Sequence, residues 1–154
     1  MNDHRDDEDP RLREAVVALS QGDFATSLQL ARQTAEEGDA LAMHFVGWHY
    51  HKGLGVPEDQ AAAVSWWCKA ASAGHAVAMR ALGWALETGE GLEADPVAAY
   101  ICYSRALAAG DRDAAEALTE LAPRLAPDQV RAAEAELKAG EPDENPWQRI
   151  CASA

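Results

Sequence analysis

The sequence predicts an all-α protein, an α/α solenoid (superhelix) of antiparallel helix hairpins with about eight helices. The first observation is an internal repeat, because Gly38, Gly74 and Gly110 are each 36 residues apart. Repeats of this length are typical of stacked helix hairpins, in which each unit covers the apolar face of its neighbour. The second observation is that apolar residues within each unit recur every three or four positions, which is the periodicity of an amphipathic helix.

The repeat keeps one register, without a gap, over two complete copies. Small, aromatic and acidic positions of the first copy all recur 36 residues later. The matched pairs are Ala42 and Ala78, Gly47 and Gly83, Trp48 and Trp84, Gly53 and Gly89, Gly55 and Gly91, Asp59 and Asp95, Ala63 and Ala99, and Ala70 and Ala106. We therefore expect two equivalent units, at residues 38–73 and 74–109.

In each unit, the first helix is expected to end at a glycine and the second to begin at an aspartate. Ala42, Val46 and Tyr50 form one packing stripe on the first helix of the first unit. Gly53 follows at a place where a left-handed glycine commonly ends a helix. Asp59 is suited to cap the next helix, because its carboxylate can accept hydrogen bonds from the free backbone N–H groups.

The second unit has the same start and stop signals. Asp95 is followed by Pro96, the common order of an N-cap and a first helical residue. Gly110 then ends the helix. Gly47 and Gly83 fall inside helices, where glycine costs about 1 kcal/mol relative to alanine. Its recurrence indicates that two helices approach too closely there for a side chain.

The flanks are partial copies, as expected for the ends of a solenoid. The region 23–38 matches the second half of a unit, and 111–122 matches the first half. Pro127 begins a polar last helix that is expected to act as a cap. The predicted organisation is an acidic disordered tail (1–10), a repeat domain (11–139) and a tail (140–154), and the repeat domain divides into an N-terminal hairpin (11–37), two repeats (38–73 and 74–109) and a capping hairpin (110–139).

The C-terminal tail leaves two possibilities open. The stretch from Gly140 to Pro146 is expected to be extended. Trp147 and Ile150 either anchor the end of the tail on the last helices or lie free.

Charge and composition restrict the partners. The net charge of −13 disfavours nucleic acid, whose phosphates would be repelled, and would attract a basic protein. No apolar run has the roughly 18–20 residues of a membrane span. The N-terminal residues lack the basic and apolar pattern of a secretory signal, so a cytoplasmic location is predicted.

The three cysteines follow no CxxC spacing, and together with the missing signal they are interpreted as reduced thiols. Cys68 and Cys102 are expected to be small buried hydrophobic residues. Cys151, in the tail, is expected to be the more exposed and more reactive thiol.

These motifs resemble the Sel-1-like repeat family, a relative of the tetratricopeptide repeat. The first copy carries the family pattern almost completely, as Ala42, Val46-Gly47, Tyr50, Gly53-Leu54-Gly55-Val56, Asp59, Ala63, Trp66, Lys69-Ala70-Ala71 and Gly74. The second copy departs from it at Leu86 and Cys102, both apolar. The resemblance implies an adaptor or scaffold. A secreted branch, some of whose members are linked to penicillin binding, has a cysteine pair in each repeat. This chain lacks that pair, so the activity is not carried over.

A second apolar row on the first helices is the candidate binding surface, where a peptide or helix would dock. It is expected on the concave face, with Met43, His44 and Met79 at its rim. The alternative is that the row packs between units as core. The predicted protein-binding residues are Leu41, Phe45, Trp48 and Lys52 from the first unit, and Val77, Arg80, Ala81 and Trp84 from the second.

No enzyme, cofactor or metal motif is present in the sequence. His49 and His51 project roughly 200° apart around a helix, so they cannot converge on one ion. Gly53-x-Gly55 has no preceding strand, which argues against a dinucleotide site. Two alternative functions remain open. One is a hydrolase or small-molecule binder that uses His44, Arg80 and Glu87, and the other is a homo-oligomer formed through the tryptophan row.

Overall fold

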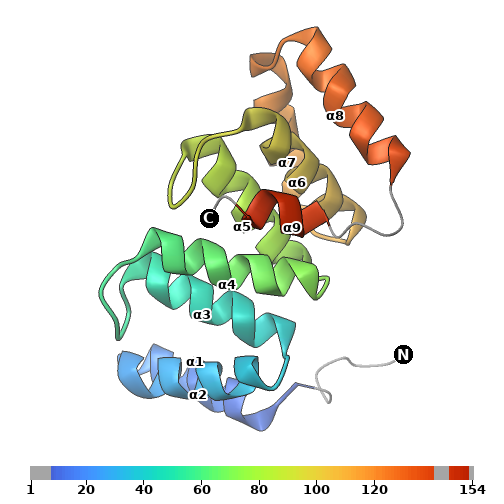
Figure 1. Ribbon diagram of the computed structural model, residues 1–154. Coiled ribbons are helices and arrows are strands. Elements are labelled where there is room, and N and C mark those ends of the chain that lie inside the picture. Colours follow the sequence, from blue (N-terminus) through green and yellow to red (C-terminus); the bar gives the residue numbers. More distant parts are fainter. Residues whose placement is uncertain (1–7, 141–145, 153–154) are drawn as a thin grey trace.

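The structure is a computed structural model that describes residues 8–140 and 146–152. This part of the chain is all helical, with no strand, and none of its helices is long and apolar enough to cross a membrane. The elements, shown in Figure 1, are α1 (Pro10–Ser20), α2 (Phe24–Glu36), α3 (Ala40–Lys52), α4 (Gln60–Ser72), α5 (Ala76–Thr88), α6 (Pro96–Ala108), α7 (Ala114–Leu121), a short 3-10 helix (Ala122–Arg124), α8 (Pro127–Ala139) and α9 (Pro146–Cys151).

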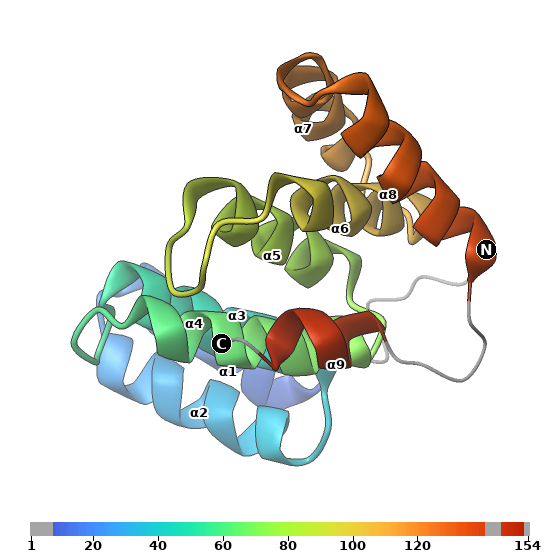
Figure 2. The ribbon, with the colours of Figure 1, turned by 45° about the horizontal axis from the view of Figure 1, so that its top comes forward.

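The helices form a solenoid of stacked hairpins, as the repeat predicts. Helices α1 and α2, α3 and α4, and α5 and α6 pack as pairs, and α2 against α3 and α4 against α5 join one pair to the next. Figure 2 shows the pairs as successive layers, with α8 packed beyond α6. The hairpins α3–α4 and α5–α6 are therefore the two equivalent units that the repeat predicts.

The predicted helix boundaries are confirmed in detail. The carboxylate of Asp59 accepts a hydrogen bond from the N–H of Ala62, and that of Asp95 accepts two such bonds at the start of α6. These bonds satisfy N–H groups that have no partner inside the helix. Gly53 and Gly89 end α3 and α5 in the left-handed conformation, with φ of 64° and 78°.

Each Gly-x-Gly loop rests on the preceding hairpin. A Cβ atom on Gly55 would lie 2.6 Å from the carbonyl oxygen of Phe24, the first residue of α2. A Cβ atom on Gly91 would collide in the same way with the carbonyl of Gln60, the first residue of α4. The second glycine of the loop is therefore needed for close approach as well as for its positive φ.

The C-terminal segment differs from the prediction, because it adds a ninth helix within the described residues. Trp147 and Ile150 are buried and complete the central core, so the tail is anchored. The main contact of α9 is with α4, and Arg149 of α9 also forms an ion pair with Glu136 of α8. Residues 1–7 of the predicted disordered tail (1–10) and residues 141–145, most of the predicted extended stretch, lie outside the described residues. The end of the predicted tail is ordered instead, because Asp9 caps α1 and Pro10 is its first residue.

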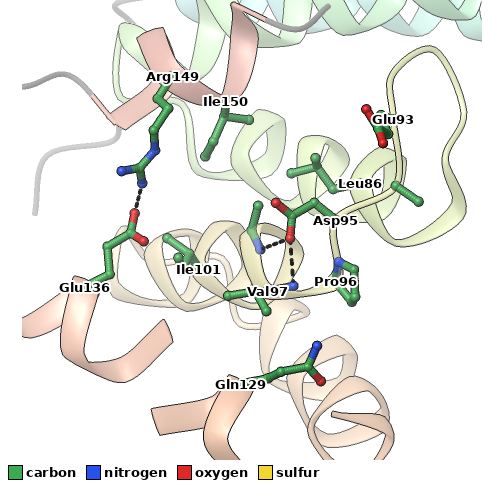
Figure 3. A pocket seen from close by; sticks show the side chains of 12 residues that line it. Leu86, Glu93, Asp95, Pro96, Val97, Ile101, Gln129, Glu136, Arg149 and Ile150 are labelled. Carbon is green, nitrogen blue, oxygen red and sulfur yellow. Dashed lines mark hydrogen bonds and ion pairs between the residues drawn. The ribbon is translucent and has the colours of Figure 1, made fainter. Parts of the chain in front are cut away.

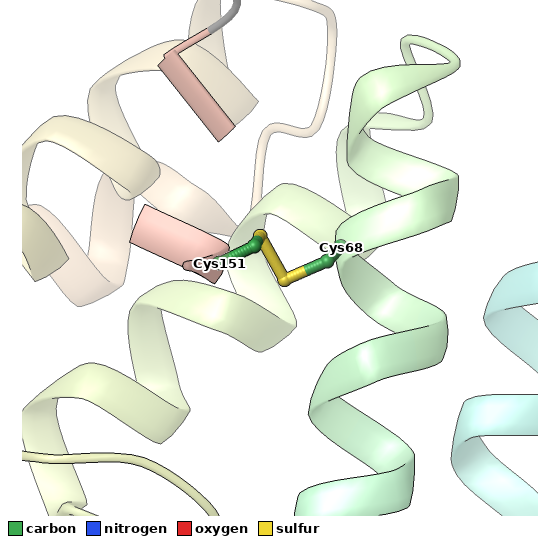
Figure 4. The surroundings of a disulfide bond; sticks show 2 residues. All are labelled: Cys68 and Cys151. Carbon is green, nitrogen blue, oxygen red and sulfur yellow. A yellow bond between two sulfur atoms is a disulfide. The ribbon is translucent and has the colours of Figure 1, made fainter. Parts of the chain in front are cut away.

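A disulfide joins Cys68 in α4 to Cys151 at the end of α9, with 6.0 Å between their Cα atoms (Figure 4). The prediction of reduced thiols is therefore wrong for these two residues, and the predicted reactive thiol of Cys151 is not free. The prediction holds for Cys102, which is free and fully buried, and burial raises the pKa of its thiol to about 12. Spacing alone could not pair two cysteines 83 residues apart.

Candidate protein-binding groove

An open groove of about 980 Å³ is bounded by the first helices of three successive units, α3, α5 and α7. Most of the predicted protein-binding residues lie in it. The groove is lined by Trp48, Lys52, Val77, Arg80, Ala81 and Trp84 among them. Leu41 and Phe45 do not line it. Phe45 packs against the N-terminal core and stacks on Trp48, whereas Leu41 is exposed.

The expected rim residues divide in the same way. His44 lines the groove, but Met43 packs against the core and Met79 belongs to it. Trp48 and Trp84 are both half-buried, so each tryptophan combines a packed side with an accessible one. The apolar row that contains Trp48 and Trp84 is therefore neither fully exposed nor fully buried.

Two further aromatic side chains, which sequence reasoning missed, reach the groove from the second helices. Trp67 in α4 lies against Gly47, and Tyr103 in α6 lies against Gly83. A Cβ atom on either glycine would come within 2.6 Å of the opposing aromatic ring. The glycines thus let these rings pass between the helices of a hairpin and line the groove. The signal was present in the sequence, because Trp67 and Tyr103 are themselves 36 residues apart.

His51 packs against two of the tryptophans that line the groove. Its ring packs edge-on against Trp84, with 5.0 Å between centroids, and lies 5.6 Å from Trp67. Its Nδ1 is 2.8 Å from the side-chain oxygen of Gln60. Because an amide oxygen only accepts, His51 donates this bond, and the orientation of its ring is set by α4.

Glu87 links the groove wall to the next unit. The hydroxyl of Tyr103 donates a 2.8 Å hydrogen bond to Glu87, which also pairs with Arg124. Burial, and then the bond to Glu87, raises the pKa of Tyr103 well above its usual range, so its hydroxyl stays protonated. The side chains on this wall are thereby held in place without a ligand.

A histidine pair lies at the opposite end of the groove. His44 and His75 stack with 5.0 Å between ring centroids. Burial, then the neighbouring His75 and Arg80, lowers the pKa of His44 to about 4, against a smaller opposing effect of Asp111. Burial also lowers the pKa of His75, whose Nδ1 accepts the N–H of Ala78 and so caps α5. Both rings are therefore neutral at pH 7.

The residues considered for a hydrolase are all in the groove, but each is already engaged. Arg80 forms a 2.5 Å ion pair with Asp111, and Glu87 is bound as described above. His44 is neutral and stacked. Among the described residues, no group of three metal-ligating side chains is arranged to hold an ion.

A serine and a histidine meet elsewhere, between α2 and α3. Ser27 Oγ is 3.1 Å from His49 Nε2, and His49 Nδ1 is 2.8 Å from the carbonyl of Leu54. A carbonyl only accepts, so Nδ1 carries the proton and Nε2 accepts from the serine. Both residues are fully buried, so this pair secures the Gly53–Gly55 loop and is not accessible to a substrate.

A second hollow, of about 500 Å³, lies where α6 begins and is bordered by α8 and α9. Figure 3 shows Asp95, Pro96 and Val97 along one side, with an ion pair between Glu136 and Arg149 on the other. Its charged groups come from three elements and do not converge on one point in this view. We therefore take the groove on α3, α5 and α7 as the candidate site.

Comparison with known proteins finds a matching repeat family and solved structures of similar architecture. The Sel1 repeat model matches the chain twice, at residues 40–75 and 76–111. A protective antigen of uropathogenic Escherichia coli with an SLR fold is similar in structure, with a TM-score of 0.77 and 21% identity over 93% of this chain and 29% of that one. A Sel1 repeat protein from Oxalobacter formigenes gives a TM-score of 0.58 and 32% identity over 61% of this chain and 39% of that one.

No curated protein matches the chain. The chain spans less than half the length of either solved protein. At 21% identity, the likeness to the antigen shows the fold alone. The two matched repeats coincide with the hairpins α3–α4 and α5–α6 that form most of the groove. Residues 40–111 therefore form two Sel1 repeats, and the helices on either side continue the same solenoid.

Proposed function

We propose that this protein is a protein-interaction module, an adaptor or scaffold, that binds a peptide or helix of a partner in the groove on α3, α5 and α7. The observation that carries the proposal is the repeated, half-exposed tryptophan. Trp48 and Trp84 occupy equivalent positions in adjacent units and line one open groove. Tryptophan is the residue most enriched among those that dominate binding energy at protein interfaces.

The groove is also pre-organised. His51 is held by Gln60, and Tyr103 is held by Glu87, so the aromatic rings lose little conformational freedom when a partner arrives. Its open form and its extension over three units suit an elongated segment better than a compact small molecule. These features favour binding of a peptide or helix over the hydrolase or small-molecule alternative.

The test combines substitution with site-specific crosslinking. A photo-crosslinking amino acid at Thr88, an exposed groove residue, should capture a partner from the native host extract. The same group at Ser65, which is exposed on α4 away from the groove, should not capture it. The double variant Trp48→Ala with Trp84→Ala should abolish the capture at Thr88 while circular dichroism stays unchanged.

Trp66→Ala provides the matched control, because Trp66 is half-buried and lies outside the groove. Its ring is covered by Lys69, whose Nζ atom lies 4.1 Å from the ring centroid. The substitution removes one indole without touching the site, and it should leave the capture intact. If the double variant unfolds instead, the two tryptophans are core and the proposal fails. Light scattering across concentration distinguishes a second copy of this chain from a different partner.

A further inference from the structure

The groove changes its chemistry from one unit to the next. In the third copy, the positions equivalent to Val77 and Trp84 are Asp113 and Glu120, each 36 residues further on. Glu116 lies between them on the same face of α7, and all three line the groove. We call Asp113, Glu116 and Glu120 the α7 acidic row. The groove therefore runs from an aromatic end on α3 and α5 to an acidic end on α7.

The charges of this row are largely uncompensated. All three side chains are exposed, and Asp113 is 80% exposed. Within the described residues, Glu116 and Glu120 form no ion pair, and Asp113 has only a 3.6 Å contact to Arg80. The charge of Arg80 is already met by the buried carboxylate of Asp111, 2.5 Å away. The acidic end therefore faces solvent without a cation of its own.

We propose that the groove recognises a bipartite basic segment, in which an apolar anchor lies on Trp48 and Trp84 and lysine or arginine side chains lie on the α7 acidic row. The proposal rests on the proposed function and names the chemistry of its partner. A cation that approaches the row also passes Trp84, whose ring face attracts a positive charge. The net charge of −13 steers such a segment toward the protein.

Lys52 sets the direction of the segment. It is exposed at the aromatic end, on α3, and within the described residues it forms no ion pair. A lysine or arginine of the partner is repelled there and attracted at α7. The basic residues of the segment should therefore follow one side of the anchor only, and a segment with evenly distributed charge should bind less well.

The probe is a random twelve-residue peptide library displayed on phage and selected on the immobilised full chain. Enriched peptides should combine an aromatic or aliphatic residue with two or more lysines or arginines on one side of it. Selection on Glu116→Lys with Glu120→Lys should lose the basic residues but keep the apolar anchor. Selection on Trp48→Ala with Trp84→Ala should lose the anchor.

Affinity measurements with an enriched synthetic peptide give the magnitude. Glu116→Gln with Glu120→Gln should weaken binding about three- to tenfold, as expected for two exposed charge pairs. Glu14→Gln with Glu134→Gln removes the same charge from exposed positions on α1 and α8, and it should leave the affinity unchanged within about twofold. Raising the salt concentration should weaken binding to the wild type more than to the Glu116/Glu120 variant.

The outcomes separate this inference from the proposed function. If peptides depend on the two tryptophans but show no basic residues, or ignore the Glu116/Glu120 variants, the bipartite inference is wrong and the groove remains a protein-binding site. If the tryptophan variant selects the same peptides as the wild type, or no peptide is enriched, both proposals are overturned.

Discussion

Gly47 lies directly against the indole of Trp67, so that a Cβ atom on the glycine would be 2.5 Å from Nε1 of the ring. The same relationship holds between Gly83 and the ring of Tyr103 in the next unit. A glycine inside a helix is unfavourable by itself, and here it is retained because it admits an aromatic ring between two helices.

Gly47→Ala should destabilise the protein although alanine is the better helix former. The new methyl group must displace the buried indole of Trp67, and overpacking of this kind costs about 1–3 kcal/mol. The free energy of unfolding, measured by urea denaturation, should fall accordingly. Ser65→Ala, an exposed position on α4, should not lower it. An unchanged or raised stability of Gly47→Ala would show that the ring moves freely.

Reduction of the Cys68–Cys151 disulfide should destabilise the fold and release α9. The bond closes a loop across 83 residues, and loss of such a crosslink typically costs about 2–4 kcal/mol. An isolated helix of six residues is not stable in water, so the packing of Trp147 and Ile150 depends strongly on the crosslink. Hydrogen exchange of residues 146–151 with and without dithiothreitol measures the release.

Cys151→Ser supplies the control for the reductant. This variant should behave like the reduced wild type and should not respond further to dithiothreitol. Cys102→Ser should keep its response, because Cys102 takes no part in the disulfide. A wild type whose stability and exchange are the same under both conditions would contradict the prediction.

Acidification should destabilise the protein between about pH 6.5 and pH 4. The folded pKa of His44 is about 4, below its usual value of 6.5, mainly because of burial. In this range the unfolded chain binds a proton that the folded one does not, so stability is lost as the pH falls. After allowance for the partial exposure of the ring, His44 should account for about 1–2 kcal/mol of the stability lost over this pH range.

The melting temperature as a function of pH tests this sign. His44→Gln should flatten the profile between pH 6.5 and pH 4. The remaining slope is expected from His49 and His75, whose pKa values are also lowered by burial. A His44→Gln profile that parallels the wild type would show that His44 does not cause the loss of stability at low pH.

Asp111→Asn should destabilise the junction between the second and third units. Asp111 is 8% exposed, pairs with Arg80 and accepts the N–H of Asp113. Removal of one partner leaves the other charge without compensation, and a loss of about 1–3 kcal/mol is expected. Asp113→Asn is the matched control, because the exposed carboxylate lies 3.6 Å from Arg80 and should contribute about 0–1 kcal/mol. Equal losses in the two variants would contradict this account.

The repeated part of the fold was predicted well from the sequence, because each helix start and stop signal occurs in both copies of the repeat. Asp59 and Asp95 cap their helices, and Gly53 and Gly89 end theirs, as their spacing indicated. The segment that has no counterpart in a second unit was not predictable in this way. Helix α9 is short, and its partner α4 lies far away in the sequence, so no local pattern pointed to it.

The groove was predictable only in part. Helical spacing placed Trp48 and Trp84 on one face, but it could not determine that the row turns away from the groove at Phe45, which packs inward. The contribution of Trp67 and Tyr103 depends on how two helices cross at a glycine. That crossing is a property of packing between helices, which the periodicity of one helix does not contain.

The close packing of each Gly-x-Gly loop also explains where the series of complete units ends. The loop of one unit covers the start of the second helix of the unit before it, at Phe24 and again at Gln60. The next equivalent position is Pro96, and there no such loop follows, because Pro127 stands where the third loop glycine would be. The hollow beside Pro96 lies where such a loop would rest. A complete 36-residue unit inserted after Gly110 would bring a Gly-x-Gly loop to this position and lengthen the superhelix by one unit.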